Sequence, residues 1–125
     1  MLYVSITGMR VRSAFAMPRF VWHAVRSMAQ ARSADGILFA EARRIGGVHH
    51  TLTVWRSREH MLAYLSSGAH RQAMRAFADL GTGTTFGYTA PAFPSWDDAL
   101  AEWAANGRPA GRPHRPDAER SAVAE

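Results

Sequence analysis

The 125-residue sequence predicts an α+β domain with the ferredoxin-like order β-α-β-β-α-β, followed by one more helix. Two observations lead to this fold class. The spacing of apolar residues switches between period two, typical of strands, and the helical period, in that order along the chain. A Gly46-Gly47 pair between two β-prone runs, residues 37–45 and 48–55, predicts a hairpin.

Residues 2–11, LYVSITGMRV, are expected to form the first strand. Their apolar and polar side chains alternate with period two. Val4 and Ile6 should therefore point to one face of the sheet, and Ser5 and Thr7 to the other.

A helix is predicted from Pro18 to Arg32, because proline suits a first helical turn. One apolar stripe of this helix is expected to face the core: Phe20, Val21, Ala24, Val25, Met28 and Ala31. His23 lies on the polar side of the helix and is expected to be solvated. Residues 33–36, SADG, end the helix.

The segment after the hairpin predicts an interrupted helix and a strand. Ser57 is expected to cap a helix at residues 58–67, Gly68 interrupts it, and residues 69–80 resume the helical spacing. The glycine- and threonine-rich run at residues 81–90 is β-prone and completes the predicted sheet.

The C-terminal part divides into a short helix and a tail. Ser95 is expected to cap the helix, and Asp97 and Asp98 lie in its favourable first turn. Residues 1–105 then form a single domain. Residues 106–125 form an Arg/Pro-rich tail with almost no large apolar side chain, so we expect it to be disordered and dispensable for folding.

Composition excludes several classes of function. The chain has no cysteine, which rules out disulfides, iron–sulfur clusters and thiolate zinc sites. All 15 basic residues are arginines without a basic stripe interleaved with aromatics, so the formal charge of +5 does not predict nucleic-acid binding. No signal-peptide pattern and no apolar run of about 18 residues is present. We therefore expect a cytoplasmic protein with no membrane partner.

One face of the predicted sheet carries small uncharged side chains: Ser5, Thr7, Thr51, Thr53, Thr85 and Thr89. A sheet with helices on one side leaves its other face bare, and an uncharged bare face suits burial against another sheet. We therefore expect a homodimer joined through this Ser/Thr face, with the two sheets closing into a barrel.

Residues 49–77, HHTLTVWRSREHMLAYLSSGAHRQAMRAF, resemble the centre of the antibiotic biosynthesis monooxygenase-like proteins of the dimeric α+β barrel superfamily. The shared features are a strand that ends in an aromatic residue, a polar turn, a helix, a break at SGAH and a second helical piece. The resemblance covers residues 2–90, and the stretch is also similar to spheroidene monooxygenase-like proteins. It implies a dimeric α+β barrel, and some members of the superfamily oxidise phenolic substrates without a cofactor while others bind or degrade haem.

The resemblance has consequences at single positions. Trp55 occupies the position of the strand-end tryptophan of the quinone-forming oxygenases, and Thr51 replaces their asparagine. Tyr64 stands where the haem-degrading members carry a tryptophan, and Met74 where they carry the proximal histidine. Haem degradation by that set of residues is therefore disfavoured.

Two adjacent histidines, His49 and His50, lie near the start of the third predicted strand. Neighbouring side chains in a strand point to opposite faces, so these two cannot chelate one metal together, and no metal site is predicted. His70 is the stronger candidate for chemistry, because its helical stripe continues through Met74 and Phe77 and should face the interior. An imidazole there either has a hydrogen-bond partner or acts as a base.

The hypothesis that follows is a small cofactor-independent monooxygenase that acts on an apolar or aromatic small molecule. Its predicted catalytic residues are His70 and Trp55, and its predicted substrate-binding residues are Thr51, His49, Trp22 and Tyr64. No metal and no other cofactor is expected. Two alternatives stay open: a protein that binds haem or another small ligand without turnover, and a non-catalytic structural dimer.

Overall fold

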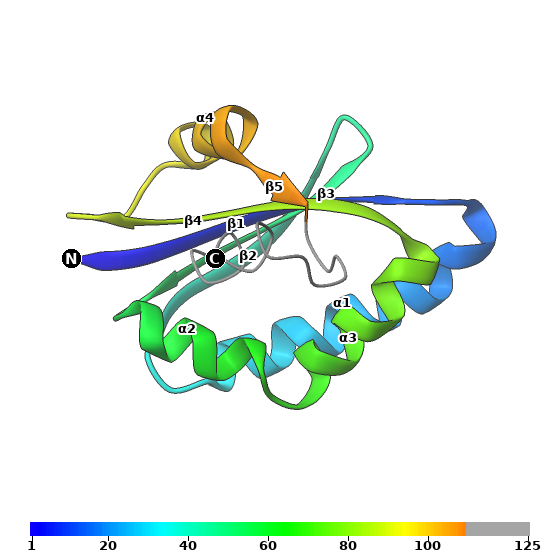
Figure 1. The fold of residues 1–125 in the computed structure, drawn as a ribbon, viewed down its shortest axis with the longest axis horizontal. Helices are drawn as coiled ribbons and strands as arrows, with labels where there is room; N and C mark the ends of the chain where they lie inside the picture. The colour runs from blue at the N-terminus through cyan, green and yellow to red at the C-terminus, as the bar shows by residue number, and fades with distance from the viewer. Residues whose placement is uncertain (110–125) are drawn as a thin grey trace, which may run out of the picture.

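A computed structural model describes residues 1–109 of the chain, apart from the side chain of Ala78. These residues form a five-stranded antiparallel sheet with the strand order β2-β3-β1-β4-β5 (Figure 1). The elements, in chain order, are β1 (Leu2–Val11), the 3-10 turn η1 (Ala14–Ala16), α1 (Met17–Ser33), β2 (Ile37–Ile45), β3 (Val48–Trp55), α2 (Arg58–Leu65), α3 (Gly68–Leu80), β4 (Gly81–Ala90), α4 (Trp96–Asn106) and β5 (Arg108–Pro109).

The predicted α+β fold class and element order are confirmed. The first four strands begin and end where the sequence pattern places them, and α1 begins one residue before Pro18. The sequence pattern missed η1 and β5. The predicted domain boundary at residue 105 is too early, because Arg108 and Pro109 pair with Thr85 and Thr84 of β4. The rest of the predicted tail, residues 110–125, lies outside the described residues.

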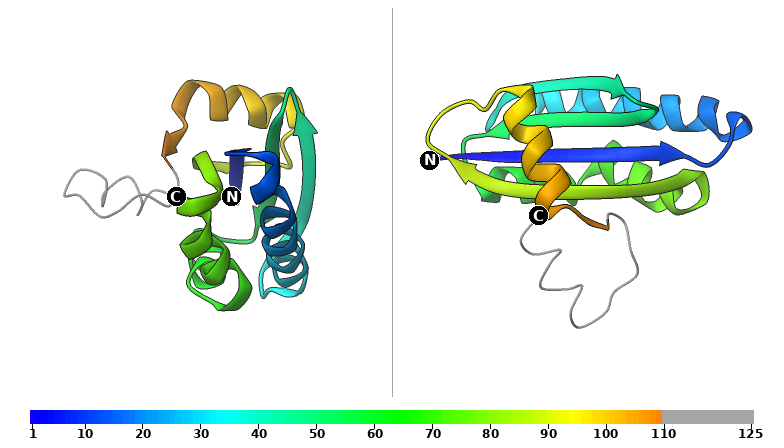
Figure 2. Two further views of the ribbon diagram at one scale, coloured as in Figure 1. Left: turned by 90° about the vertical axis from the view of Figure 1, so that its right-hand side faces the viewer. Right: turned by 90° about the horizontal axis from the view of Figure 1, so that it is seen from above.

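Helices lie on both sides of the sheet. Figure 2 shows α1, α2 and α3 along one face and α4 across the other. In the register of β1 and β3, Ser5 pairs with Thr53 and Thr7 with Thr51. These side chains point toward α1–α3, and we call this surface the helix-side face. The opposite surface, on which α4 lies, is the α4-side face.

The predicted location of the dimer interface is therefore wrong. The alternation along β1 and β3 is as expected, but the Ser/Thr face lies beneath α1, α2 and α3 and is not available to a second sheet. On the α4-side face, α4 lies across part of the sheet, where Ala99 packs with apolar strand residues, while Phe86 and Tyr88 stay partly exposed. Dimerisation itself stays a prediction.

The apolar stripe of α1 is narrower than the sequence pattern indicates. Phe20 and Ala31 are buried, whereas Val21 and Val25 are 47% and 62% exposed. The inward side of α1 also includes His23, which lines the space between α1, α3 and the sheet. None of the helices formed by residues 1–109 has the length and apolar composition needed to cross a membrane.

Two tryptophans fix α4 to the sheet. Trp103 donates a hydrogen bond from Nε1 to the carbonyl oxygen of Thr84, at 2.8 Å. Its ring lies over Gly8, where a Cβ would overlap the indole. The absence of a side chain at Gly8 therefore lets α4 approach the centre of the sheet.

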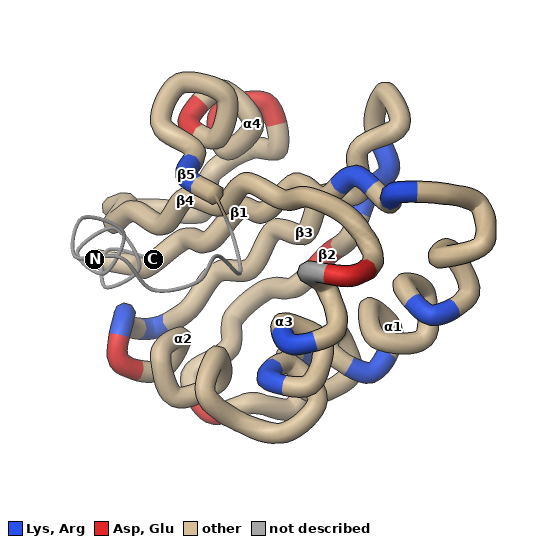
Figure 3. Tube along the Cα trace, turned by 45° about the vertical axis from the view of Figure 1, so that its right-hand side comes forward, with Lys and Arg blue, Asp and Glu red and all other residues tan. Residues whose placement is uncertain are grey.

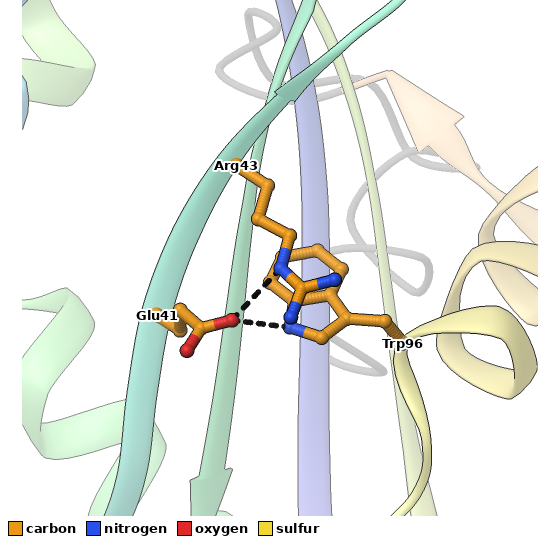
Figure 4. Close-up of polar contacts among 3 residues, drawn as sticks. All are labelled: Glu41, Arg43 and Trp96. Atoms are coloured by element: carbon orange, nitrogen blue, oxygen red, sulfur yellow. Dashed lines mark hydrogen bonds and ion pairs between the residues drawn. The ribbon is translucent and has the colours of Figure 1, made fainter.

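The second tryptophan, Trp96, joins α4 to β2 (Figure 4). Its Nε1 donates to Oε1 of Glu41 at 2.7 Å, and the same oxygen accepts from Nε of Arg43 at 2.9 Å. The Arg43 guanidinium carbon lies 4.7 Å from the centre of the Trp96 ring, a cation–π distance. Oε1 of Glu41 thus accepts hydrogen bonds from one side chain of α4 and one side chain of β2.

Replacing Trp96 with phenylalanine keeps an aromatic ring but removes the donor to Glu41. We expect the free energy of unfolding to fall by about 1 kcal/mol, as for a lost hydrogen bond to a charged group that stays accessible to water. Urea denaturation measures this change. The matched control is Trp22→Phe on the exposed side of α1, for which we expect a change of less than about 0.5 kcal/mol. Equal losses in both variants would contradict the role of the Glu41 contact.

Candidate functional site

A cavity of about 300 Å³ lies between the helix-side face of the sheet and the helices α1, α2 and α3. Small side chains of β1 and β3 form its floor: Ser5, Thr7, Thr51 and Thr53. Larger apolar side chains form most of its walls: Phe20, Met28, Met61, Leu65, Met74 and Phe77. An apolar cavity of this size with a few polar groups is typical of small-molecule sites.

His70 reaches the cavity from the first turn of α3. Its Nδ1 lies 3.4 Å from the carbonyl oxygen of Leu65, which can only accept a hydrogen bond, so Nδ1 carries the proton in the neutral ring. Nε2 is then the unprotonated nitrogen. Burial lowers the pKa of His70 below its usual 6.5, and the bond to Leu65 offsets part of this effect. His70 is therefore neutral at pH 7 and can accept a proton.

Three aromatic rings form a row from the sheet to His70. The Tyr64 ring lies 5.1 Å from Trp55 on one side and 4.7 Å from His70 on the other, between ring centres. The Tyr64 hydroxyl donates to the carbonyl oxygen of Ser27 at 2.9 Å, which joins α2 to α1. Burial raises the pKa of Tyr64, and the contact with Ser27 acts against this shift. Tyr64 is thus uncharged at pH 7, and its ring packs against the His70 ring.

Gln30 of α1 fixes the backbone around His70. Its Oε1 accepts from the His70 backbone N–H at 3.0 Å, and its Nε2 donates to the Ser67 carbonyl oxygen at 3.2 Å. The Gln30 side chain thus uses both its oxygen and its nitrogen to bond the backbone where α2 ends and α3 begins. This contact joins residues 40 positions apart, so no local pattern could have indicated it.

Two further histidines line the cavity, His49 from β3 and His23 from α1. Burial is the main cause that lowers the pKa of each. Nearby arginines lower them further: Arg44 beside His49, and Arg19 and Arg26 beside His23. The cavity therefore holds three imidazoles that are neutral at pH 7.

His23 was expected to be solvated, and this expectation is wrong. Its Nδ1 is buried and has no hydrogen-bond partner among the described residues. Within residues 1–109, no three side chains of the types that ligate metals form a group that could hold a metal ion.

Four of the predicted site residues line the cavity: His70, Tyr64, Thr51 and His49. Trp55 and Trp22 do not. Trp55 is fully buried behind Tyr64, and its Nε1 donates to Oγ1 of Thr53 at 2.9 Å. Trp22 is 55% exposed and points away from the sheet, with the Arg26 guanidinium over its ring. The adjacent pair also separates as expected, since His50 lies on the α4-side face against the Trp103 ring.

The lowered pKa of His70 predicts a pH dependence of stability. In the unfolded chain the imidazole returns to its usual pKa, so the unfolded state binds the proton more readily as the pH falls through 6.5. The contribution of the neutral, buried ring is present above this pH and is lost below it. We expect the free energy of unfolding to fall between about pH 7.5 and about pH 5.5, and to fall less steeply in His70→Gln. Urea denaturation across this range gives both slopes, and identical slopes would contradict the burial of a neutral His70.

No protein-family model matches the sequence. No curated protein matches it either. Solved structures do share the fold. The chain resembles Rv0793 from Mycobacterium tuberculosis with a TM-score of 0.68 at 15% identity, over 76% of this chain and 100% of that one.

Two others carry names that describe a chemistry. SnoaB, a cofactor-independent oxygenase from Streptomyces nogalater, gives a TM-score of 0.62 at 16% identity, over 74% of this chain and 95% of its own. A proposed antibiotic biosynthesis monooxygenase from Deinococcus radiodurans gives 0.65 at 17% identity, over 74% and 96% of the two chains. At these identities the likeness concerns the fold, and the chain has the ferredoxin-like α+β fold of these proteins.

Proposed function

We propose that the protein is a small monooxygenase that oxidises an electron-rich aromatic molecule in this cavity without a cofactor. The observation that carries the proposal is His70, a neutral imidazole with an unprotonated Nε2, whose side chain lines an otherwise largely apolar cavity. The fold shared with SnoaB, a cofactor-independent oxygenase, supports the same reaction class.

In the proposed reaction a phenol and O₂ give a quinone and water. Nε2 of His70 takes the phenolic proton, and the phenolate transfers one electron to O₂. The resulting phenoxyl radical and superoxide combine at a ring carbon, and His70 returns the proton to the peroxide. Cleavage of the O–O bond releases one oxygen as water, together with the hydrogen of that carbon, and the other oxygen stays as the new carbonyl.

The other cavity residues would position the substrate. Apolar walls such as Met74 and Phe77 suit an aromatic ring and exclude water from the reacting atoms. The hydroxyl of Thr51 on the floor can bond an oxygen substituent of that ring. Tyr64 and Gln30 hold His70 in place, as described above.

Replacing His70 with glutamine tests the proposed base. With a dihydroxynaphthalene as substrate, an oxygen electrode should record one O₂ consumed for each quinone formed by the wild-type protein. Removal of a general base should lower kcat about 100-fold or more. The matched control is His60→Gln, because His60 lies outside the cavity and bonds Ser57. We expect this control to keep wild-type turnover.

Two results would contradict the proposal. If His70→Gln folded and oxidised the substrate at the wild-type rate, His70 would not be the base. If the wild-type protein bound aromatic molecules but consumed no O₂ with any phenol of a broad panel, it would be a ligand-binding protein without turnover.

A further inference from the structure

We infer that the cavity selects ligands that carry a negative charge, such as aromatic carboxylates, and that Arg32 recognises this charge. The inference deepens the proposed function, because it takes the cavity to be the substrate site and names the class of substrate. It concerns binding, and it holds whether or not the ligand is oxidised.

The charged side chain that borders the cavity is positive. Among the lining residues that belong to the described part of the chain, residues 1–109, there is no aspartate or glutamate, and Arg32 is the single arginine. The remaining polar groups are hydroxyls and the three imidazoles of His23, His49 and His70. A cavity without a carboxylate does not repel an anion, and a guanidinium at its edge attracts one.

Arg32 is free to bind a ligand. It lies in the last turn of α1, is exposed to solvent and still borders the cavity. No described residue forms a hydrogen bond or ion pair with its side chain, whereas Arg26 bonds Gln72 and Arg43 bonds Glu41. A cation in the last turn also interacts with the helix dipole, but this leaves the N–H donors of the guanidinium available to a carboxylate.

Arginines on the neighbouring elements add positive charge near the cavity. Figure 3 shows basic positions along α1 and α3, and acidic positions on α4 across the sheet as well as at the start of α2 and near the end of α3. Arg19 and Arg26 lie close enough to His23 to act on it, and Arg44 does the same at His49. Glu41 is on the α4-side face, where it is bonded to Trp96 and Arg43.

The acidic residues nearest in sequence to the cavity helices do not offset these cations. Asp35, Glu59 and Asp79 are exposed, and none of them lines the cavity. Solvent screens these carboxylates, as it screens the exposed Arg19 and Arg44, so the charge that acts most directly on a ligand is that of Arg32, which borders the cavity.

A matched pair of probes tests the inference: 6-hydroxy-2-naphthoate, which is an anion at pH 7, and its uncharged methyl ester. Fluorescence titration gives a Kd for each. We expect the wild-type protein to bind the acid about fivefold more tightly than the ester, which is the upper range for one solvent-exposed ion pair. Arg32→Gln should bind both probes equally, with the affinity for the ester unchanged. Arg32→Lys should keep part of the preference.

The control is Arg75→Gln, which removes the same charge from an exposed position on α3 that does not line the cavity. We expect it to keep the preference for the acid. Equal affinity of the wild-type protein for acid and ester, or the same loss in Arg75→Gln as in Arg32→Gln, would overturn the inference and leave the proposed function standing. If neither probe bound, the inference would be overturned, and the proposed function would be decided by the O₂ measurements with the panel of phenols.

Discussion

The alternation of side-chain size along β1 and β3 determines how the rest of this molecule is arranged. On the α4-side face, Val4, Ile6, Leu52 and Val54 are almost completely buried and pack into one core cluster. On the helix-side face, the central alternate positions carry serine and threonine, which are too small to fill the space of about 10 Å that separates packed layers. The same two strands thus build a solid core on one side and the floor of a cavity on the other. A slip of one residue in the register would exchange the two faces.

Different contacts attach the helices to the two faces of the sheet. On the α4-side face, the helix closes the core through Ala99, which packs among the strand residues, and through the contacts of Trp96 and Trp103. On the helix-side face, α1 and α3 pack on each other and meet the sheet mainly near their ends. Hydrogen bonds of Gln30 join α1 to α3, and the hydrogen bond of Tyr64 joins α2 to α1. The cavity stays open because these contacts hold the helices above the short floor side chains.

Most of the fold could be predicted from the sequence because its signals are local. Alternation marked the strands, and Ser57 and Ser95 capped α2 and α4 as expected. The turn at Gly46 and Gly47 adopts φ angles of 57° and 78°, which few other residues tolerate. The short strand β5 carries no such signal, since Arg108 and Pro109 have no alternation and pair only through a distant strand.

The site was harder to predict, because it depends on which face the helices cover. Alternation shows that two faces differ, but it does not say on which one a helix packs, and the Ser/Thr face was therefore assigned to a dimer interface. The inward position of His23 is missed for the same reason. A cavity accepts a polar side chain that a packed core would exclude, and alternation does not predict a cavity. Trp55 was placed at the site because of its position at the strand end, but Tyr64 lies between it and His70.

The central claim is that the space above the helix-side face binds an aromatic molecule, and intermolecular NOEs measure this directly. With 6-hydroxy-2-naphthoate bound, we predict NOEs from its ring protons to the methyl groups of Thr51 and Met74, which both line the cavity. NOEs confined to Leu52 and Val54 on the α4-side face, or the absence of any NOE from a bound ligand to the cavity, would contradict it.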